Sequence, residues 1–247
     1  MSWIYDCAVS ALRWWFDRRI SGSATLEADQ LFPNARHFVS NWAEIREEAS
    51  RATRHLHKIP RFHELMRAQK SISANDGRDW RMFVARAYGV TFQPNLKQCP
   101  TLASILACSP DVLSASFSIL GPGKFVPPHR GPFRGVLRGY LVLTMPKHDD
   151  GIPAAVLMID GCEHRLEEGD FVLWDDTFEH SVWNESNESR IVLLLDIKRR
   201  NMPLDLSIVS NIIIYGIRLS ILLSRSRRSL AILSRLPDKA DDSLDQS

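Results

Sequence analysis

The sequence predicts a mainly β fold with a helical cover (α+β), organised around a closed or double-sheet β core of the jelly-roll kind. Between residues 114 and 197, short apolar runs alternate with turns, and no helical periodicity separates them. One of the turns is the pair Asp160-Gly161, which favours a tight hairpin because such a hairpin needs positive φ. The run 190–197 is almost continuously apolar, which is typical of a central strand covered on both faces.

Eight strands are expected in this region, each bounded by glycine, proline, aspartate or asparagine. They are 114–120, 125–129, 136–144, 155–160, 163–166, 171–174, 180–183 and 190–197. So many short strands in succession favour two packed sheets or a closed barrel. The residues before them, 34–69, show helical periodicity with an apolar stripe of Trp42, Ile45 and Ala49, and Pro100 begins a further short helix at 101–107. We therefore predict that the first half of the chain, including the tryptophan-centred segment 76–88, is a helical cover.

Two histidines and two arginines mark a candidate site among the strands. His129 ends one strand and His180 begins another, while Arg138 and Arg190 lie near the starts of two more. Neutral imidazoles ligate redox metals, and the arginine fork binds carboxylates. Strand alternation places Arg138 and Tyr140 on one face. Because an arginine in a buried strand is costly unless it meets an anion or lies at the rim, we expect both arginines at the mouth of the barrel.

Five motifs occur in chain order between residues 117 and 196, within a similarity that covers roughly residues 32–203. They are FSILGPG at 117–123, HRGP at 129–132, LRGYL at 137–141, DDTFEHSVW at 175–183, and Arg190 followed by Asp196. In order and spacing they resemble the aspartyl/asparaginyl β-hydroxylase family. Members of that family are oxygenases dependent on Fe(II) and 2-oxoglutarate, and they include bacterial hydroxylases of lipid A and of ornithine lipids. The resemblance implies the double-stranded β-helix fold as well as this activity.

The resemblance also implies the metal ligands. His129 and His180 would bind iron and be the catalytic residues, with O2 as the oxidant. Gly131 stands two residues after His129, where most 2-oxoglutarate oxygenases carry a carboxylate, so water is expected in that ligand position. The neighbouring acids Asp175 and Asp176 are interpreted as turn caps or as residues that orient His180.

The cosubstrate residues are carried over in the same way. Ser118, Arg138 and Arg190 are implied to anchor 2-oxoglutarate, since a dicarboxylate that chelates iron at one end needs a charge-assisted fork at the other. Tyr140 stands where many family members have histidine. Its hydroxyl is expected to donate a hydrogen bond from the face that it shares with Arg138.

The function predicted is that of a hydroxylating dioxygenase. It would act on an unactivated C–H bond, with the acyl chain of a bacterial membrane lipid as the first choice of substrate. The alternatives are β-hydroxylation of aspartyl or asparaginyl residues in a peptide or protein, hydroxylation of a free amino acid, and a non-catalytic binding module. Fold analogy does not choose among these substrates, because all of them share one fold and iron site.

Composition narrows the choice of partner and location. The 247 residues are 45% hydrophobic with a formal net charge of +2, which is too small to favour a nucleic-acid partner. The spacing of the four cysteines (Cys7, Cys99, Cys108, Cys162) matches no metal or redox motif. The cysteines favour a cytoplasmic protein, and the composition leaves the oligomeric state open. A peripheral position at the inner membrane is the further expectation from the resemblance and from the C-terminal helix described below.

Three segments are expected: an amphipathic segment at 1–30, the oxygenase domain with its helical buttress at 31–203, and a C-terminal helix with a polar tail at 204–247. The first segment is interpreted as a helix packed on the β core, with a membrane-facing helix as the alternative. Asp6 and the lack of a basic start argue against a signal peptide.

The C-terminal segment is interpreted as a basic amphipathic helix at 208–236. Asn211 and Arg218 interrupt its apolar run, which argues against an ordinary membrane span. Basic residues follow without an acidic neighbour: Arg225, Arg227, Arg228 and Arg235. Such a helix can lie at an anionic membrane interface. The alternative is that this helix docks on its own domain or on a second subunit. Pro237 is expected to end the helix.

Overall fold

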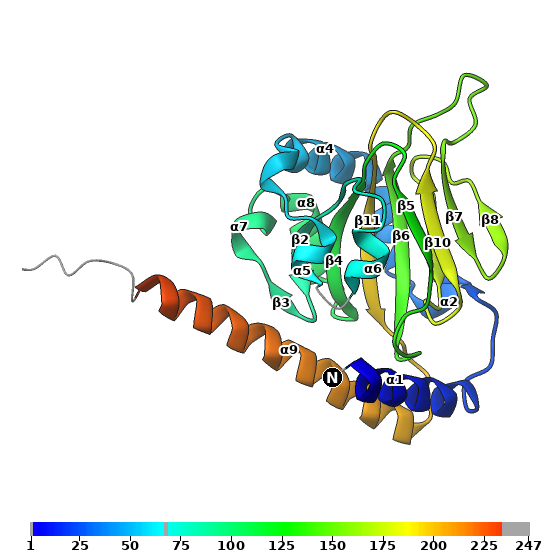
Figure 1. The fold of residues 1–247 in the computed structure, drawn as a ribbon, viewed down its shortest axis with the longest axis vertical. Helices are drawn as coiled ribbons and strands as arrows, with labels where there is room; N and C mark the ends of the chain where they lie inside the picture. Colours follow the sequence, from blue (N-terminus) through cyan, green and yellow to red (C-terminus); the bar gives the residue numbers. More distant parts are fainter. Residues whose placement is uncertain (1, 67–68, 234–247) are drawn as a thin grey trace, which may run out of the picture.

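The structure is a computed structural model that describes residues 2–66 and 69–233; the side chains of residues 2–6, 8 and 225–233 are not among those described. Two antiparallel sheets face each other (Figure 1). The strands are β1 (Thr25–Leu26), β2 (Trp80–Ala87), β3 (Val90–Thr91), β4 (Val112–Leu120), β5 (Phe125–His129), β6 (Val136–Thr144), β7 (Ala155–Ile159), β8 (Cys162–His164), β9 (Phe171–Trp174), β10 (His180–Asn184) and β11 (Arg190–Lys198). The larger sheet has the order β1-β9-β6-β11-β4-β2-β3, and the smaller one β5-β10-β7-β8.

This topology confirms the double-stranded β-helix. The eight expected strands are β4 to β11, and they divide equally between the two sheets, with β4, β6, β9 and β11 in one and β5, β7, β8 and β10 in the other. Asp160 and Gly161 have φ of 50° and 78°, as the hairpin between β7 and β8 requires. As expected, β11 is central, between β4 and β6.

The segment 76–88 is a correction, because it contains strand β2 rather than helical cover. Trp80 and Met82 pack into the space between the sheets, whereas Phe83 and Ala85 pack beneath the helices on the other face of the sheet. This alternation has a period of two, and β2 extends the larger sheet by pairing with β4. A strand buried on both faces shows little contrast between apolar and polar positions, so the segment was hard to recognise.

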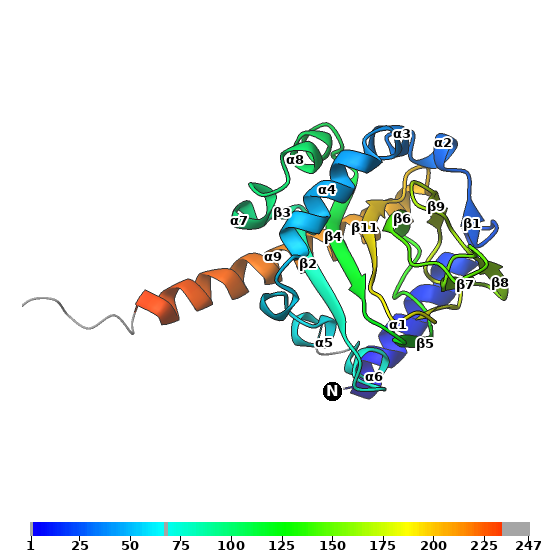
Figure 2. The same cartoon turned by 90° about the horizontal axis from the view of Figure 1, so that it is seen from above.

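Five helices cover the outer face of the larger sheet (Figure 2): α2 (Ala28–Leu31), α3 (Ala35–Ser40), α4 (Trp42–Thr53), α7 (Gln93–Leu96) and α8 (Pro100–Ala107). The other described helices are α1 (Ser2–Asp17), α5 (Phe62–Leu65), α6 (Lys70–Ser73) and α9 (Leu204–Leu233), with a short 3-10 turn at Leu56–Lys58. The predicted stripe is confirmed, because Ile45 and Ala49 of α4 are buried against the sheet and Trp42 packs beside them. A second layer of core fills the space between the two sheets, and this inner layer surrounds the site described below.

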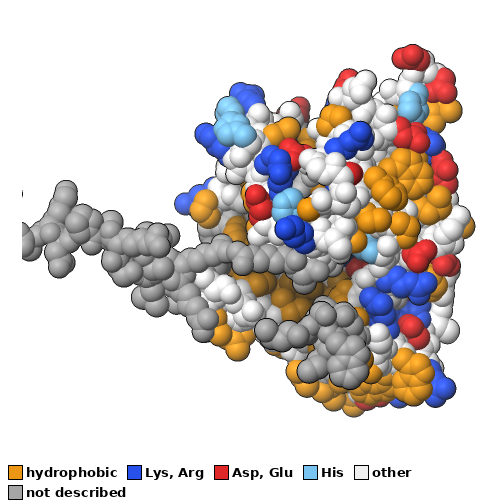
Figure 3. Space-filling model, viewed as in Figure 1, with side chains coloured by type: hydrophobic (Ala, Val, Ile, Leu, Met, Phe, Trp, Pro, Cys, Tyr) orange, Lys and Arg blue, Asp and Glu red, His pale blue; other side chains and the backbone are white. Residues whose placement is uncertain are grey.

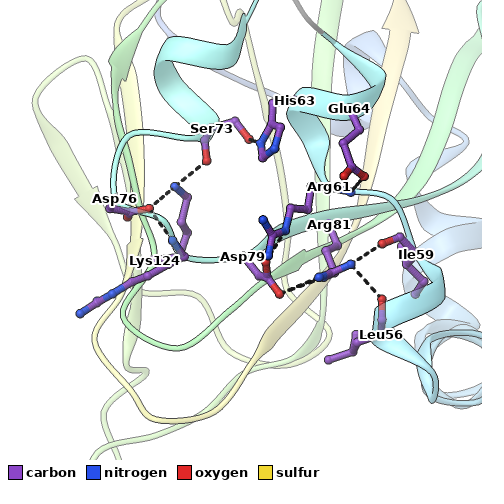
Figure 4. A network of polar contacts seen from close by, with 11 residues as sticks. Leu56, Ile59, Arg61, His63, Glu64, Ser73, Asp76, Asp79, Arg81 and Lys124 are labelled. Carbon is purple, nitrogen blue, oxygen red and sulfur yellow. Dashed lines mark hydrogen bonds and ion pairs between the residues drawn. The ribbon is translucent and has the colours of Figure 1, made fainter.

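Polar contacts fasten the segment around α5 and α6 to the β core (Figure 4). Arg81 of β2 donates hydrogen bonds to the carbonyl oxygens of Leu56 and Ile59, at 3.1 and 2.6 Å. Lys124, just before β5, is fully buried and donates to the Ser73 carbonyl oxygen and to the Asp76 carboxylate, at 2.9 and 2.6 Å. These contacts therefore attach the segment around α5 and α6 to β2 and to the start of β5.

Helices α1 and α9 lie together at one end of the sandwich (Figure 1). Phe16 of α1 packs with Phe133 and with Leu206 and Ile214 of α9, so the alternative in which the C-terminal helix docks on its own domain holds for the first half of α9. Beyond that half, α9 extends away from the body of the molecule. The part Leu204–Ser224 is long and apolar enough to cross a membrane by length and composition, with a mean hydropathy of 1.9. The arginine side chains at 225, 227 and 228, as well as residue 235, lie outside what the structure describes.

Candidate metal and carboxylate site

The two histidines of the sequence prediction lie side by side. His129, at the end of β5, pairs with His180, at the start of β10, and their ring centroids are 4.2 Å apart. The Nδ1 atom of His129 donates to the Pro127 carbonyl oxygen at 2.8 Å, and that of His180 donates to the Phe178 carbonyl oxygen at 3.0 Å. This tautomer leaves the Nε2 lone pair of each ring free, which is the arrangement a metal ligand needs.

The electrostatics of the site favour neutral imidazoles. Burial, together with the adjacent His129, lowers the pKa of His180 to about 3. Burial also lowers the pKa of His129, although its hydrogen bond to Pro127 acts in the opposite direction. A metal ion therefore has no proton to displace from either ring at neutral pH.

Asp176 lies where a side chain at position 131 would otherwise be. The Gly131 N–H donates to the Asp176 carbonyl oxygen at 2.6 Å, and a Cβ at position 131 would be 2.1 Å from the Asp176 Oδ1 atom. Glycine is thus required at 131, because any larger residue displaces this carboxylate. Arg138 donates to Asp176 Oδ2 at 2.9 Å and also forms an ion pair with Asp196. The Asp176 carboxylate, from the turn between β9 and β10, therefore occupies the space beside Gly131.

Asp175 joins the loops that carry the two histidines. Its Oδ1 accepts from the Thr177 N–H and hydroxyl, which confirms the turn cap, and its Oδ2 accepts from Arg134 and Arg199. Arg134 follows His129 in the chain, so this buried cluster fixes both loops together. The second interpretation is corrected: the ring of His180 is oriented by a backbone carbonyl rather than by either acid.

Arg190 is a buried cation that forms no ion pair among the described residues. Its side chain is 2% exposed, and neither Nε nor Nη1 has a hydrogen-bond partner among the described residues. Its guanidinium lies 5.2 Å from the centroid of the Tyr140 ring, and burial lowers its pKa. The expectation that it lies at the barrel mouth is wrong. Arg190 pairs with Leu120 while Arg138 pairs with Asp196, so the two arginines are at opposite ends of antiparallel strands.

Ser118 lines the same inner wall as Arg190. Ser118 pairs with Val192, two residues from Arg190, so their side chains share one face of the sheet. The Ser118 Oγ atom accepts a hydrogen bond from the indole N–H of Trp80 at 3.0 Å, which leaves the hydroxyl proton free to donate to a ligand. Trp80 itself is stacked on Phe62 at a centroid distance of 3.9 Å.

Sequence reasoning missed two tryptophans of this interior. Trp80 is held against Ser118, and Trp174, in β9, lies next to both Tyr140 and His180. The usable signal was alternation: Trp174 is the last residue of a strand that pairs directly with Arg138. Residues opposite each other in a sheet share a face.

The interior has the chemistry of a site for a metal ion and a dicarboxylate. Two neutral imidazoles present Nε2 atoms at one end, and a buried guanidinium without an anion lies at the other. Among the described residues, no group of three or more His, Cys, Asp or Glu could hold a metal ion. An ion bound by the histidine pair would therefore keep positions for water and for an oxygen-donor ligand, which suits iron chemistry of the open-site kind.

A surface hollow of about 540 Å³ lies elsewhere on the molecule. It is lined by Arg78, Gly123, Phe125, Trp183, Asn184 and Glu185. Phe125 begins β5 and pairs with Trp183, so this hollow is at the end of the smaller sheet away from the histidines. No histidine lines this hollow, so it offers no imidazole for a metal ion.

Comparison with known proteins adds a family to this geometry. The family model of aspartyl/asparaginyl β-hydroxylase matches residues 39–200. An ornithine lipid ester-linked acyl 2-hydroxylase of Rhizobium tropici is 33% identical over 165 residues, which are 67% of this chain and 57% of that protein. The human aspartyl/asparaginyl β-hydroxylase is 28% identical over 145 residues, or 51% of this chain and 18% of that protein. The chain therefore spans little more than half of the first relative and less than a fifth of the second.

Solved structures are more distant. A prolyl-4-hydroxylase of Pseudomonas putida aligns with 66% of this chain and 90% of its own, at a TM-score of 0.42 and 17% identity. A predicted oxalate decarboxylase of Thermotoga maritima aligns with 38% of this chain and 72% of its own, at a TM-score of 0.30 and 20% identity.

Proposed function

The chain belongs to the aspartyl/asparaginyl β-hydroxylase family, and we propose that it is an Fe(II)- and 2-oxoglutarate-dependent dioxygenase that hydroxylates the acyl chain of a membrane lipid. That it is a hydroxylase follows from the family. The cofactor, the cosubstrate and the substrate are the proposal. His129 and His180 would hold the metal; Arg190, Ser118, Arg138 and Tyr140 would hold 2-oxoglutarate.

The unpaired guanidinium of Arg190 is the observation that carries the cosubstrate assignment. A buried cation without a partner costs several kcal/mol of folding free energy, so it is retained where a ligand supplies the anion. Ser118 offers a hydroxyl on the same wall, and the Tyr140 ring packs against the guanidinium. These groups suit the carboxylate of 2-oxoglutarate that is remote from the metal.

The residues at the other end suit the chelating half of the same molecule. His129 and His180 present Nε2 atoms, and Arg138, held by Asp176 and Asp196, places a positive charge beside them. Iron(II) with 2-oxoglutarate and O2 supplies oxidative decarboxylation of the cosubstrate, coupled to oxygen transfer onto a C–H bond. The protein binds and orients both molecules, and its inner core excludes bulk water from between them.

Two observations favour a lipid. The first is the similarity to the ornithine lipid acyl hydroxylase, which exceeds the similarity to the human protein hydroxylase in identity and in coverage of this chain. The second is an exposed apolar stripe on α9, repeating every three or four residues: Ile208, Ile212, Tyr215, Leu219, Leu222 and Leu223. Water-exposed apolar residues in such a continuous row mark an interaction surface.

The stripe lies at the end of the molecule that carries the histidines. Arg13 of α1 donates to the carbonyl oxygens of Gly131 and Arg130, at 2.9 and 3.0 Å, so α1 touches the loop immediately after His129. Figure 3 shows hydrophobic side chains gathered along the edge formed by α1 and the first half of α9. Trp14 is 58% exposed there, with the Arg18 guanidinium 4.2 Å from its ring centroid, a pairing suited to a lipid headgroup region.

The decisive experiment measures lipid turnover directly. The purified protein is supplied with Fe(II), 2-oxoglutarate and a total bacterial lipid extract. We expect succinate to form and a lipid acyl chain to gain one oxygen atom, as detected by mass spectrometry. His180→Ala should abolish both signals, because it removes half of the protein's metal ligands. If an aspartyl- or asparaginyl-containing peptide stimulates succinate formation and lipid does not, the substrate is a protein rather than a lipid.

Membrane attachment has its own test. Sedimentation with anionic liposomes is compared for the natural chain and for Ile212→Glu/Leu219→Glu, which changes the exposed stripe and leaves the buried residues of α9 in place. We expect the double variant to lose most of its binding. Ile152→Glu is the control, because Ile152 is also an exposed apolar residue but lies in the β6–β7 loop, and this variant should bind as the natural chain does. Equal liposome binding by all three proteins would show that the exposed stripe of α9 does not mediate membrane attachment.

A further inference from the structure

The indole N–H of Trp174 is a buried donor without an acceptor. The side chain is 2% exposed, and its Nε1 atom has no hydrogen-bond partner among the described residues. Buried indole N–H groups almost always find a partner, because an unmade hydrogen bond costs about 1–3 kcal/mol. The other buried tryptophan of the interior follows that rule, since Trp80 donates to Ser118 at 3.0 Å. Trp174 departs from this rule, so its unpaired N–H group requires an explanation.

The position of Trp174 places this donor inside the site. Trp174 pairs directly with Arg138, so both side chains lie on the inner face of the larger sheet. Its ring lies edge-on to the His180 ring at a centroid distance of 6.0 Å, and it is 5.9 Å from the Tyr140 ring. The indole is thus bordered by a metal-binding imidazole, by the arginine at the metal end and by the tyrosine that leads towards Arg190.

We infer that Trp174 is a ligand-positioning residue whose N–H donates a hydrogen bond to the 2-oxo acid half of the bound cosubstrate. The inference rests on the proposed use of 2-oxoglutarate and adds a donor to the set named for it. An indole N–H donates but cannot accept, so the missing partner must be an acceptor. An oxygen of the 2-oxo carboxylate is such an acceptor, and that half is the one expected next to the histidines.

This assignment divides the cosubstrate pocket into two parts with different selectivity. Arg190 and Ser118 recognise any carboxylate at the remote end. Trp174 and Arg138 recognise oxygen atoms at the metal end, which 2-oxoglutarate carries as a 2-oxo acid and succinate carries only as a carboxylate on a shorter chain. Loss of the indole N–H should therefore weaken binding of 2-oxoglutarate more than binding of succinate.

The test measures binding without turnover. Isothermal titration calorimetry with Zn²⁺ in place of iron gives the affinities for 2-oxoglutarate and for succinate, first for the natural chain and then for Trp174→Phe. Phenylalanine keeps most of the buried ring and removes the N–H. We expect about a tenfold loss for 2-oxoglutarate, which is about 1.4 kcal/mol, and a change of less than twofold for succinate.

Trp183→Phe is the matched control. Trp183 also donates its N–H, to Glu185 at 3.0 Å, but it lies at the end of β10 away from the histidines. It should bind both acids as the natural chain does. A thermal unfolding midpoint within a few degrees of the natural value shows that each variant is folded.

The outcomes separate this inference from the proposal beneath it. If Trp174→Phe keeps its affinity for 2-oxoglutarate, or loses affinity equally for 2-oxoglutarate and succinate, the role of Trp174 is overturned. The proposal that the protein is a dioxygenase is not affected by either result. Absence of 2-oxoglutarate binding by the metal-loaded natural chain overturns both.

Discussion

Two cations are buried in this protein in opposite circumstances. Lys124 has no exposed side-chain surface, and its ammonium donates to the Ser73 carbonyl oxygen, to Asn75 and to the Asp76 carboxylate. Arg190 is 2% exposed, and neither its Nε nor its Nη1 has a partner among the described residues. Burial removes water from both, but only Lys124 is compensated within the chain.

The presence or absence of hydrogen-bond partners distinguishes a buried cation that stabilises the fold from one that is available to bind a ligand. A buried charge with all its hydrogen bonds made contributes to holding the fold, and removing it leaves its partners unsatisfied. A buried charge with its hydrogen bonds unmade weakens the fold, and it becomes favourable only when a ligand brings the counter-charge. By this criterion Lys124 attaches the helical cover to β5, whereas Arg190 has the features of the binding group proposed for it.

The largest expected effect is on stability, at Lys124. Lys124→Met should lower the free energy of unfolding by about 3 kcal/mol, because it leaves the Asp76 carboxylate and the Ser73 carbonyl oxygen without their donor. Urea unfolding followed by far-UV circular dichroism measures this. A loss below 1 kcal/mol would mean that the buried lysine is not compensated as its contacts indicate.

The same substitution at Arg190 should act in the opposite sense. Without ligand, Arg190→Met should leave the free energy of unfolding unchanged or raise it by about 1 kcal/mol, since an unpaired buried charge is removed. The affinity for 2-oxoglutarate, measured by calorimetry with Zn²⁺, should fall about 100-fold, or about 2.7 kcal/mol, because charge-assisted hydrogen bonds are lost. A destabilisation as large as that of Lys124→Met would show that Arg190 is structural.

This contrast also marks how far the sequence reaches. The eight strands were predictable, because alternation and turn residues are local signals. The proximity of His129 and His180 followed only from the resemblance of their motifs to a known family. That Arg190 enters the barrel from the end opposite Arg138 was not predictable, since it depends on the antiparallel register of β11 with β6. The strand β2 was missed for a related reason, because a strand buried on both faces has no polar side to show.

The site residues divide in the same way. Arg138 and Tyr140 were placed on one face by alternation within a single strand. The position of Asp176 over Gly131 depends on contact between two loops that are 45 residues apart in the chain (131 and 176), and no local pattern encodes it. Trp80 and Trp174 have large apolar rings, so from the sequence they are core residues; only their indole N–H groups distinguish them, and those depend on tertiary neighbours.

A smaller effect is expected where a hydrogen bond only orients a ligand group. Trp80→Phe removes the donor to Ser118 and keeps the stacking surface against Phe62. The freed hydroxyl can then rotate, and we expect the affinity for 2-oxoglutarate to fall about fivefold, or about 1 kcal/mol. Ser118→Ala should produce a similar loss, and the double variant should lose no more than Ser118→Ala alone. Additive losses would mean that Trp80 acts on the ligand by a separate route.

The smallest effect concerns the acid sensitivity of the compensated cation, and its sign follows from Asp76. Burial alone would raise the pKa of Asp76, but hydrogen bonds from Lys124 and from the N–H groups of Phe125 and Arg78 outweigh burial and hold this pKa below its ordinary value of 3.8. A carboxyl whose pKa is lowered by folding contributes stability that is present above the ordinary pKa and is lost as the pH falls through the folded value. Wild type should therefore be more stable than Asp76→Asn at neutral pH, and this difference in the free energy of unfolding should shrink as the pH falls below about 3.8.

Arg190 has no carboxylate among its described partners, so the stability difference between wild type and Arg190→Met should not change over that range in the absence of ligand. If the second difference also shrank with acid, an acidic group would compensate Arg190 within the folded chain, and the distinction between the two cations would fail.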